Sequence, residues 1–70
     1  MTLFQARIAL IGLRFEIKTG MLMTDPRKAN TYRLVATALG YPKNARPAKA
    51  LLADQLEEVI NAMTAEMQMA

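Results

Sequence analysis

Side chains that could do chemistry are few in this sequence, and one group of them is acidic. Asp54 and Glu58 are four residues apart with Glu57 between them, so a helix would place the first two on one face. Carboxylate oxygens are the ligands of hard cations such as Ca²⁺. A hydrated acidic face opposite Lys or Arg is the far commoner use of such a pattern. We therefore predict no metal site.

The second group is basic and surrounds a short predicted helix. Helix-turn-helix proteins contact base edges with polar residues at the start of a recognition helix. Residues of that kind here are Arg27, Lys28, Asn30, Arg33, Lys43 and Arg46. Such residues also keep the outer side of any helix hydrated, and the connection at 40–46 is long for the tight turn of this motif. DNA contact is therefore the alternative prediction.

Enzymatic chemistry lacks its usual residues. The sequence contains no His, Cys or Ser, so thiol and serine nucleophiles, the common general base and Cys/His zinc sites are missing. No glycine-rich phosphate loop is present either. The sequence predicts a protein that is not an enzyme and uses no cofactor.

Length and charge set the frame in which these residues must act. Seventy residues that are 53% apolar predict one domain, residues 1–70. Residues 1–50 contain all nine Lys and Arg and only two acids, a net charge of +7, whereas four acids and no base give the last twenty residues −4. Such polarity can pair regions within a bundle or across an oligomer, or it can steer an anionic partner.

The longest apolar run, residues 8–13, lies between Arg7 and Arg14 and is far shorter than the roughly 20 residues that cross a bilayer. A secretory leader is not expected either. The predicted location is the cytoplasm.

Apolar residues recur at three and four residues, which predicts an all-α fold of three helices at about 3–19, 26–39 and 47–67. Thr2 and Gln5 form a capping-box pattern at the first start, and Gly20 suits the residue after the helix. Asp25 and Pro26 suit the second start, although a start capped by Asn30 or Thr31 also fits.

The second and third helices each have one predicted buried stripe. Gly40 and Pro42 end the second helix, and Pro47 lies at the start of the third. The second stripe is Tyr32, Val35, Ala36 and Leu39. The third stripe is Leu52, Leu56, Val59, Ile60, Met63 and Met67. At about 1.5 Å per residue the third helix is too long for the second to cover, so its C-terminal end needs another cover.

The first helix has two apolar stripes on nearly opposite sides, Phe4, Ile8, Ile11 and Phe15 on one and Ala6, Leu10, Leu13 and Ile17 on the other. A helix on the outside of a small monomer needs only one. We therefore predict a helical-bundle homo-oligomer, with a dimer favoured. The predicted interface residues are Ala6, Ala9, Leu10, Gly12, Leu13, Ile17, Met63 and Met67.

Residues 12–21, a following Thr, a Tyr on the next helix, and Leu39-Gly40-Tyr41 before Lys43-Asn44 form a pattern that extends over about two thirds of the chain. In these residues the chain resembles short uncharacterised helical proteins encoded by bacteriophages and prophages. The resemblance implies a phage context and the host cytoplasm, and assigns no binding residue. The predicted function is a small accessory protein that binds a host or phage protein, with a DNA-binding regulator as the alternative.

Overall fold

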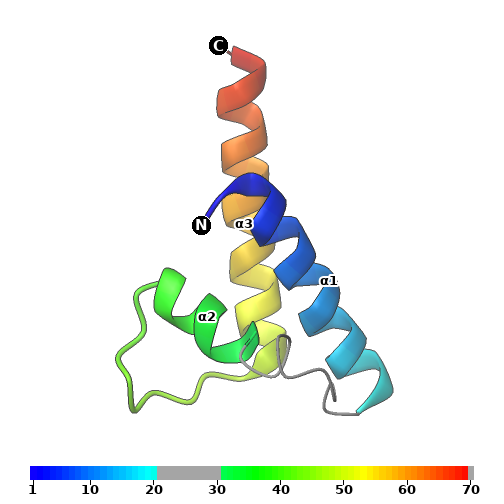
Figure 1. Ribbon diagram of the computed structural model, residues 1–70, viewed down its shortest axis with the longest axis vertical. Coiled ribbons are helices and arrows are strands. Elements are labelled where there is room, and N and C mark those ends of the chain that lie inside the picture. The colour runs from blue at the N-terminus through cyan, green and yellow to red at the C-terminus, as the bar shows by residue number, and fades with distance from the viewer. Residues whose placement is uncertain (21–30, 70) are drawn as a thin grey trace.

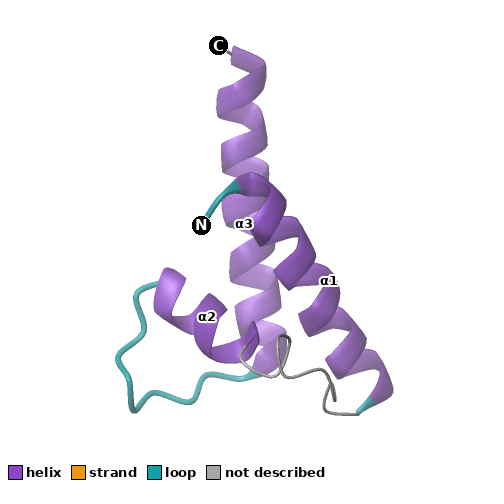
Figure 2. Ribbon diagram, in the orientation of Figure 1, coloured by secondary structure: helices purple, strands orange, loops and turns teal. Residues whose placement is uncertain are grey.

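The structure is a computed structural model that describes residues 1–20 and 31–69. In this part of the chain every regular element is a helix, and the three helices pack together (Figures 1 and 2). None of the helices in the described residues is both long enough and apolar enough to cross a membrane. The predicted all-α, three-helix fold is confirmed.

The first helix, α1, spans Leu3–Thr19, as predicted. The Gln5 N–H donates to the Thr2 hydroxyl at 3.1 Å, and the Thr2 N–H donates to the Gln5 side-chain oxygen at 2.9 Å. Gly20 follows with a left-handed φ of 66°, and its N–H donates to the Glu16 carbonyl. Glycine adopts this conformation without strain, which is why the helix ends there.

The second helix, α2, spans Thr31–Ala38. The predicted start at Asp25 and Pro26 lies outside the described residues. At the other end Gly40 has φ 89°, its N–H donates to the Thr37 carbonyl, and the Tyr41 N–H donates to the Ala36 carbonyl. These two bonds are the Schellman arrangement, which satisfies the last carbonyls of a helix. The predicted stop at Gly40 is confirmed.

The third helix, α3, spans Lys49–Met69, two residues later at each end than predicted. Its first turn closes with the Leu52 N–H donating to the Ala48 carbonyl. Pro47 stays in the connection because its carbonyl accepts a hydrogen bond from the Tyr32 hydroxyl instead of joining the helix.

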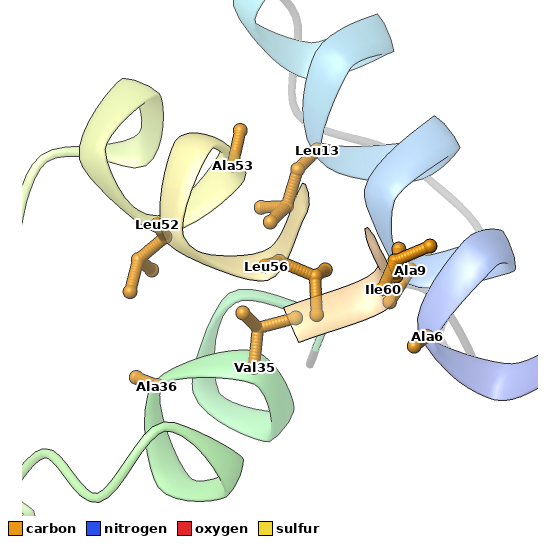
Figure 3. Close-up of a cluster of buried hydrophobic side chains, with 9 residues drawn as sticks. All are labelled: Ala6, Ala9, Leu13, Val35, Ala36, Leu52, Ala53, Leu56 and Ile60. Carbon is orange, nitrogen blue, oxygen red and sulfur yellow. The ribbon is translucent and has the colours of Figure 1, made fainter. Parts of the chain in front are cut away.

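The core lies where α1 runs antiparallel to α3 and where α2 packs beside the first half of α3 (Figure 1). Leu13, Val35 and Leu56 come from three different helices and point toward one another (Figure 3). The buried apolar side chains are Ala6, Ala9, Leu13, Val35, Ala36, Leu52, Ala53, Leu56 and Ile60. Four of these nine are alanines, whose small side chains let the helix axes approach closely.

The buried face of α1 differs from the one expected from the sequence. Ala6 and Leu13 are buried, but Ile17 of the same stripe is exposed, and Ala9 and Glu16, which belong to neither predicted stripe, face α3. Small Ala9 accommodates α3 more closely than Ile17 can. The Glu16 carboxylate is compensated by an ion pair, with the Lys49 ammonium nitrogen 3.3 Å from its oxygen.

The buried stripe of α3 is also shorter than predicted. Leu52, Leu56 and Ile60 are buried, whereas Val59 and Met67 are exposed and Met63 is half-buried. Met67 is exposed because of length: α3 has 21 residues and α1 has 17, and the C-terminal end of α3 projects past the start of α1 (Figure 1). Val59 lies between the buried Leu56 and Ile60 and instead lines a hollow beside Tyr41. The projecting end is uncovered in a single chain, as the length argument predicts.

Candidate functional site

One side of α1 carries large apolar side chains that the fold leaves in solvent. Phe4, Ile8, Ile11 and Phe15 are between 51% and 73% exposed. Their spacing of four, three and four residues is that of the seam by which one helix packs on another. A monomeric soluble protein rarely exposes a continuous apolar patch of this kind without using it.

A groove of about 890 Å³ opens between this side of α1 and α2. From α1 it is lined by Ile8, Ile11 and Phe15, with Ala9 and Gly12 between the groove and the core. Because Ala9 and Gly12 have little or no side chain, space remains between the α1 side chains and α2. We call this feature the α1–α2 groove.

The α2 side of the groove follows from how α2 packs. Val35 and Ala36 point into the core, which turns Leu34 outward on the same helix. Leu34 is 56% exposed and lines the groove together with Thr31, Thr37 and Ala38. Among the described residues that line the groove none has a charged side chain. Its chemistry therefore suits an apolar helix face of a partner.

Basic side chains border the exposed α1 stripe. At about 100° per residue, Arg7, Arg14 and Lys18 lie next to it on the side away from the groove. Arg14 is paired, because its guanidinium is 2.7 Å from the Glu57 carboxylate. Arg7 and Lys18 form no ion pair with any carboxylate that the structure describes. We call these three residues the basic border.

The projecting end of α3 has the opposite charge. Met67 is 67% exposed and Met63 half-buried, and Glu66 is exposed. No Lys or Arg occurs anywhere from residue 50 onward. This end is therefore a partly uncovered amphipathic helix with a negative charge.

The predicted interface residues fall into two groups. Ala6, Ala9 and Leu13 are buried inside one chain against α3, so their apolar surface is already used in the intrachain core. Leu10 packs half-buried against the same core. The other predicted residues remain accessible: Gly12, Ile17, Met63 and Met67.

The predicted nucleic-acid residues are only partly described. Arg27, Lys28 and Asn30 lie outside the described residues. Arg33, Lys43 and Arg46 are exposed. The Arg46 guanidinium donates to the backbone carbonyls of Lys43 and Ala45, which fixes it against its own loop.

The acidic residues do not converge on one point. In residues 1–20 and 31–69, no three acidic side chains are grouped closely enough to hold a metal ion. Glu57 forms an ion pair with Arg14.

A second, smaller hollow of about 350 Å³ lies beside Tyr41 and Glu58, and the Tyr41 hydroxyl there donates to the Gln55 side chain. Among the described residues that line it, Glu58 is the only acid.

Sequence reasoning did not single out Leu34 as a groove residue, and it placed much of the oligomer interface on the side of α1 that a single chain buries. The available signal was size: the stripe that contains Ala6, with Ala9 at its edge, permits the closest helix packing, which leaves the bulkier Phe4–Phe15 stripe outside. Comparison with known proteins adds no information on the site, since no family model, curated protein or solved structure matches the chain.

Proposed function

We propose that this protein is a small non-enzymatic binding protein that acts as a homo-oligomer, holding an apolar helix in the α1–α2 groove. The observation that carries the proposal is the groove itself, because the large apolar side chains of Ile8, Ile11, Phe15 and Leu34 line it and are exposed. Phe4, also exposed, extends the same α1 stripe beyond the groove. An amphipathic helix laid in an apolar groove is a recurrent mode of protein recognition. A phage accessory role in the host cytoplasm is the biological context that we propose for it.

The energetics support a contact made more than once. Fully burying one such side chain contributes about 1.5–3 kcal/mol, so covering five that are half or more exposed contributes about 4–10 kcal/mol. Association costs about 4–15 kcal/mol in lost translational and rotational freedom. A single groove contact is therefore marginal. In a two-fold homodimer the same contact occurs twice. The free energy of burial is then doubled while the cost of association is incurred once, which favours a homodimer.

The test is the mass of the protein in solution with and without a polar residue in the groove. We expect the wild-type chain to exceed its 7.8 kDa monomer mass in light scattering at tens of micromolar. Ile8→Asp and Ile11→Asp should each lower the mass to that of one chain. Leu51→Asp is the control, since Leu51 is exposed on α3 away from the groove lining. Helix content by circular dichroism confirms that each variant folds.

The proposal fails if the wild-type protein has the mass of one chain, or if the groove variants and the Leu51 control have the same mass. Ile8 and Ile11 are exposed, so a polar residue there leaves the intrachain core intact. A change in mass with unchanged helix content therefore reports the interface and not the fold.

DNA binding is the second candidate function. The observation that favours it is that Arg33 of α2 and Lys43 and Arg46 of the following loop are exposed, with no described carboxylate paired to them. Contacts of this type bind phosphates without sequence preference, and their affinity falls steeply with salt. Titration of a labelled duplex at low and at moderate salt tests this candidate.

A further inference from the structure

We propose that the occupant of the α1–α2 groove is the projecting C-terminal end of α3 from a second copy of this chain, exchanged reciprocally between two subunits. This inference rests on the proposed function and names the partner of the same site. Each chain has two uncovered apolar surfaces, the groove and the projecting end of α3. The packing of α1 on α3 keeps these two surfaces apart within one chain, so they can meet only between two chains.

The projecting end has the form that the groove requires. The C-terminal end of α3 continues beyond the start of α1 as part of one helix that runs to Met69, so it is already helical before any partner binds (Figure 1). Met63 and Met67 are four residues apart and follow the buried positions Leu56 and Ile60 on the same face. Methionine side chains are flexible and fill irregular apolar spaces well.

Charge complementarity distinguishes the projecting end of α3 from the other exposed apolar surfaces as the occupant of the groove. The basic border, which flanks the exposed α1 stripe on the side away from the groove, offers Arg7 and Lys18 without a described partner. The projecting end offers the exposed Glu66 and no cation. Approach of the two surfaces therefore brings opposite charges together around an apolar contact, which steers association and specifies the partner.

The main competing occupant, α1 of a second copy, has the wrong charge. Its exposed stripe is bordered by the same Arg7, Arg14 and Lys18 in both copies. Antiparallel pairing of two α1 stripes would place one basic border against the other, and like charges across helices are destabilising. The exchange of α3 ends avoids this repulsion. It is also self-complementary, as a two-fold dimer interface must be.

A pair of single-substitution chains tests the exchange. Ile11→Asp damages the groove and leaves the α3 end intact, and Met67→Lys does the opposite. Both residues are exposed, so both chains should fold. Each variant alone should have the mass of one chain. An equimolar mixture should form a heterodimer, because one contact is then intact and the other places the introduced lysine against the introduced aspartate. We expect it to be at least about tenfold tighter than either homodimer.

Disulfide cross-linking provides the second measurement, because the wild-type chain has no cysteine. Met67→Cys and Leu34→Cys chains, mixed and oxidised, should form a covalent dimer of one chain of each kind. The matched control mixes Met67→Cys with Leu51→Cys, whose residue is exposed outside the groove. Only the first mixture should cross-link efficiently. These conservative changes at exposed positions keep the test valid if a charged variant fails to fold.

The outcomes separate this inference from the proposed function. If Ile11→Asp lowers the mass but Met67→Lys does not, and the mixture gains nothing, the groove binds something other than the α3 end. The exchange is then refuted while the groove proposal stands. A wild-type protein with the mass of one chain refutes both. Equal cross-linking in the two cysteine mixtures also overturns the exchange.

Discussion

Replacing Leu56 with alanine tests whether apolar packing against α3 holds this fold together. Leu56 is 1% exposed and lies among core residues from all three helices (Figure 3). Truncating a buried leucine removes its transfer free energy and leaves a cavity, which together cost about 2–5 kcal/mol. A domain of this length has a total stability of about 4–10 kcal/mol. The substitution should therefore remove a large share of the stability.

The matched control is Leu51→Ala, the same chemical change on the same helix at a position that is 46% exposed. Its cost should stay below about 1 kcal/mol, because exposed substitutions away from special features change stability little. Glu57→Gln is the second comparison. Its ion pair with Arg14 is about half exposed on both sides, so its loss should cost at most about 1 kcal/mol at moderate salt.

The assay is thermal and urea unfolding followed by circular dichroism, with every variant at the same chain concentration because association also raises apparent stability. At about 4–8 °C per kcal/mol for a domain of this size, the cost of about 2–5 kcal/mol means that Leu56→Ala should lower the melting temperature by about 8–40 °C. Loss of the cooperative transition would also meet the expectation. If Leu51→Ala or Glu57→Gln were as damaging as Leu56→Ala, the burial argument for α3 would be refuted.

Three further predictions concern the ion pair of Glu16 with Lys49, the residue that ends α1, and the exposed cation Arg33 of α2. Lys49→Met should destabilise the protein by about 1–3 kcal/mol, since it leaves the buried Glu16 carboxylate without its cation, whereas Arg14→Met should cost less because Glu57 stays hydrated. Equal urea midpoints for the two variants would contradict this. Gly20→Ala should cost about 1–2 kcal/mol of stability from the left-handed backbone alone, because an added Cβ meets nothing within 4 Å. Gly20→Asn should cost less, because Asn adopts this conformation more readily. If thermal unfolding showed Gly20→Asn to be the less stable variant, a backbone cause would be excluded. If the protein binds DNA, Arg33→Ala should weaken the binding and flatten its salt dependence, and a labelled duplex that shows no binding at low salt with tens of micromolar protein removes this function.

Local signals in the sequence determined the helices and most of their ends. Thr2 with Gln5, and Gly20, act through hydrogen bonds and backbone angles within a few residues, so the bounds of α1 could be predicted. Gly40 ends α2 for the same local reason. Pro47 misled the prediction by two residues, because a hydrogen bond from Tyr32, fifteen residues away, uses its carbonyl.

The choice between the two apolar stripes of α1 was made by tertiary packing and could not be predicted from hydrophobicity. Hydrophobicity treats Ile17 and Phe15 as equally good core residues and Ala9 and Glu16 as poor ones. Packing against α3 depends on side-chain size and on the charges that α3 supplies. Ala9 is buried because its small side chain lets α1 and α3 approach closely, and Glu16 is buried because Lys49 of α3 lies beside it. The α1–α2 groove follows from that choice. The larger side chains of α1 were left outside, and Leu34 was turned toward them when Val35 entered the core. Periodicity within one helix contains neither of these facts, because both depend on which neighbour each face meets.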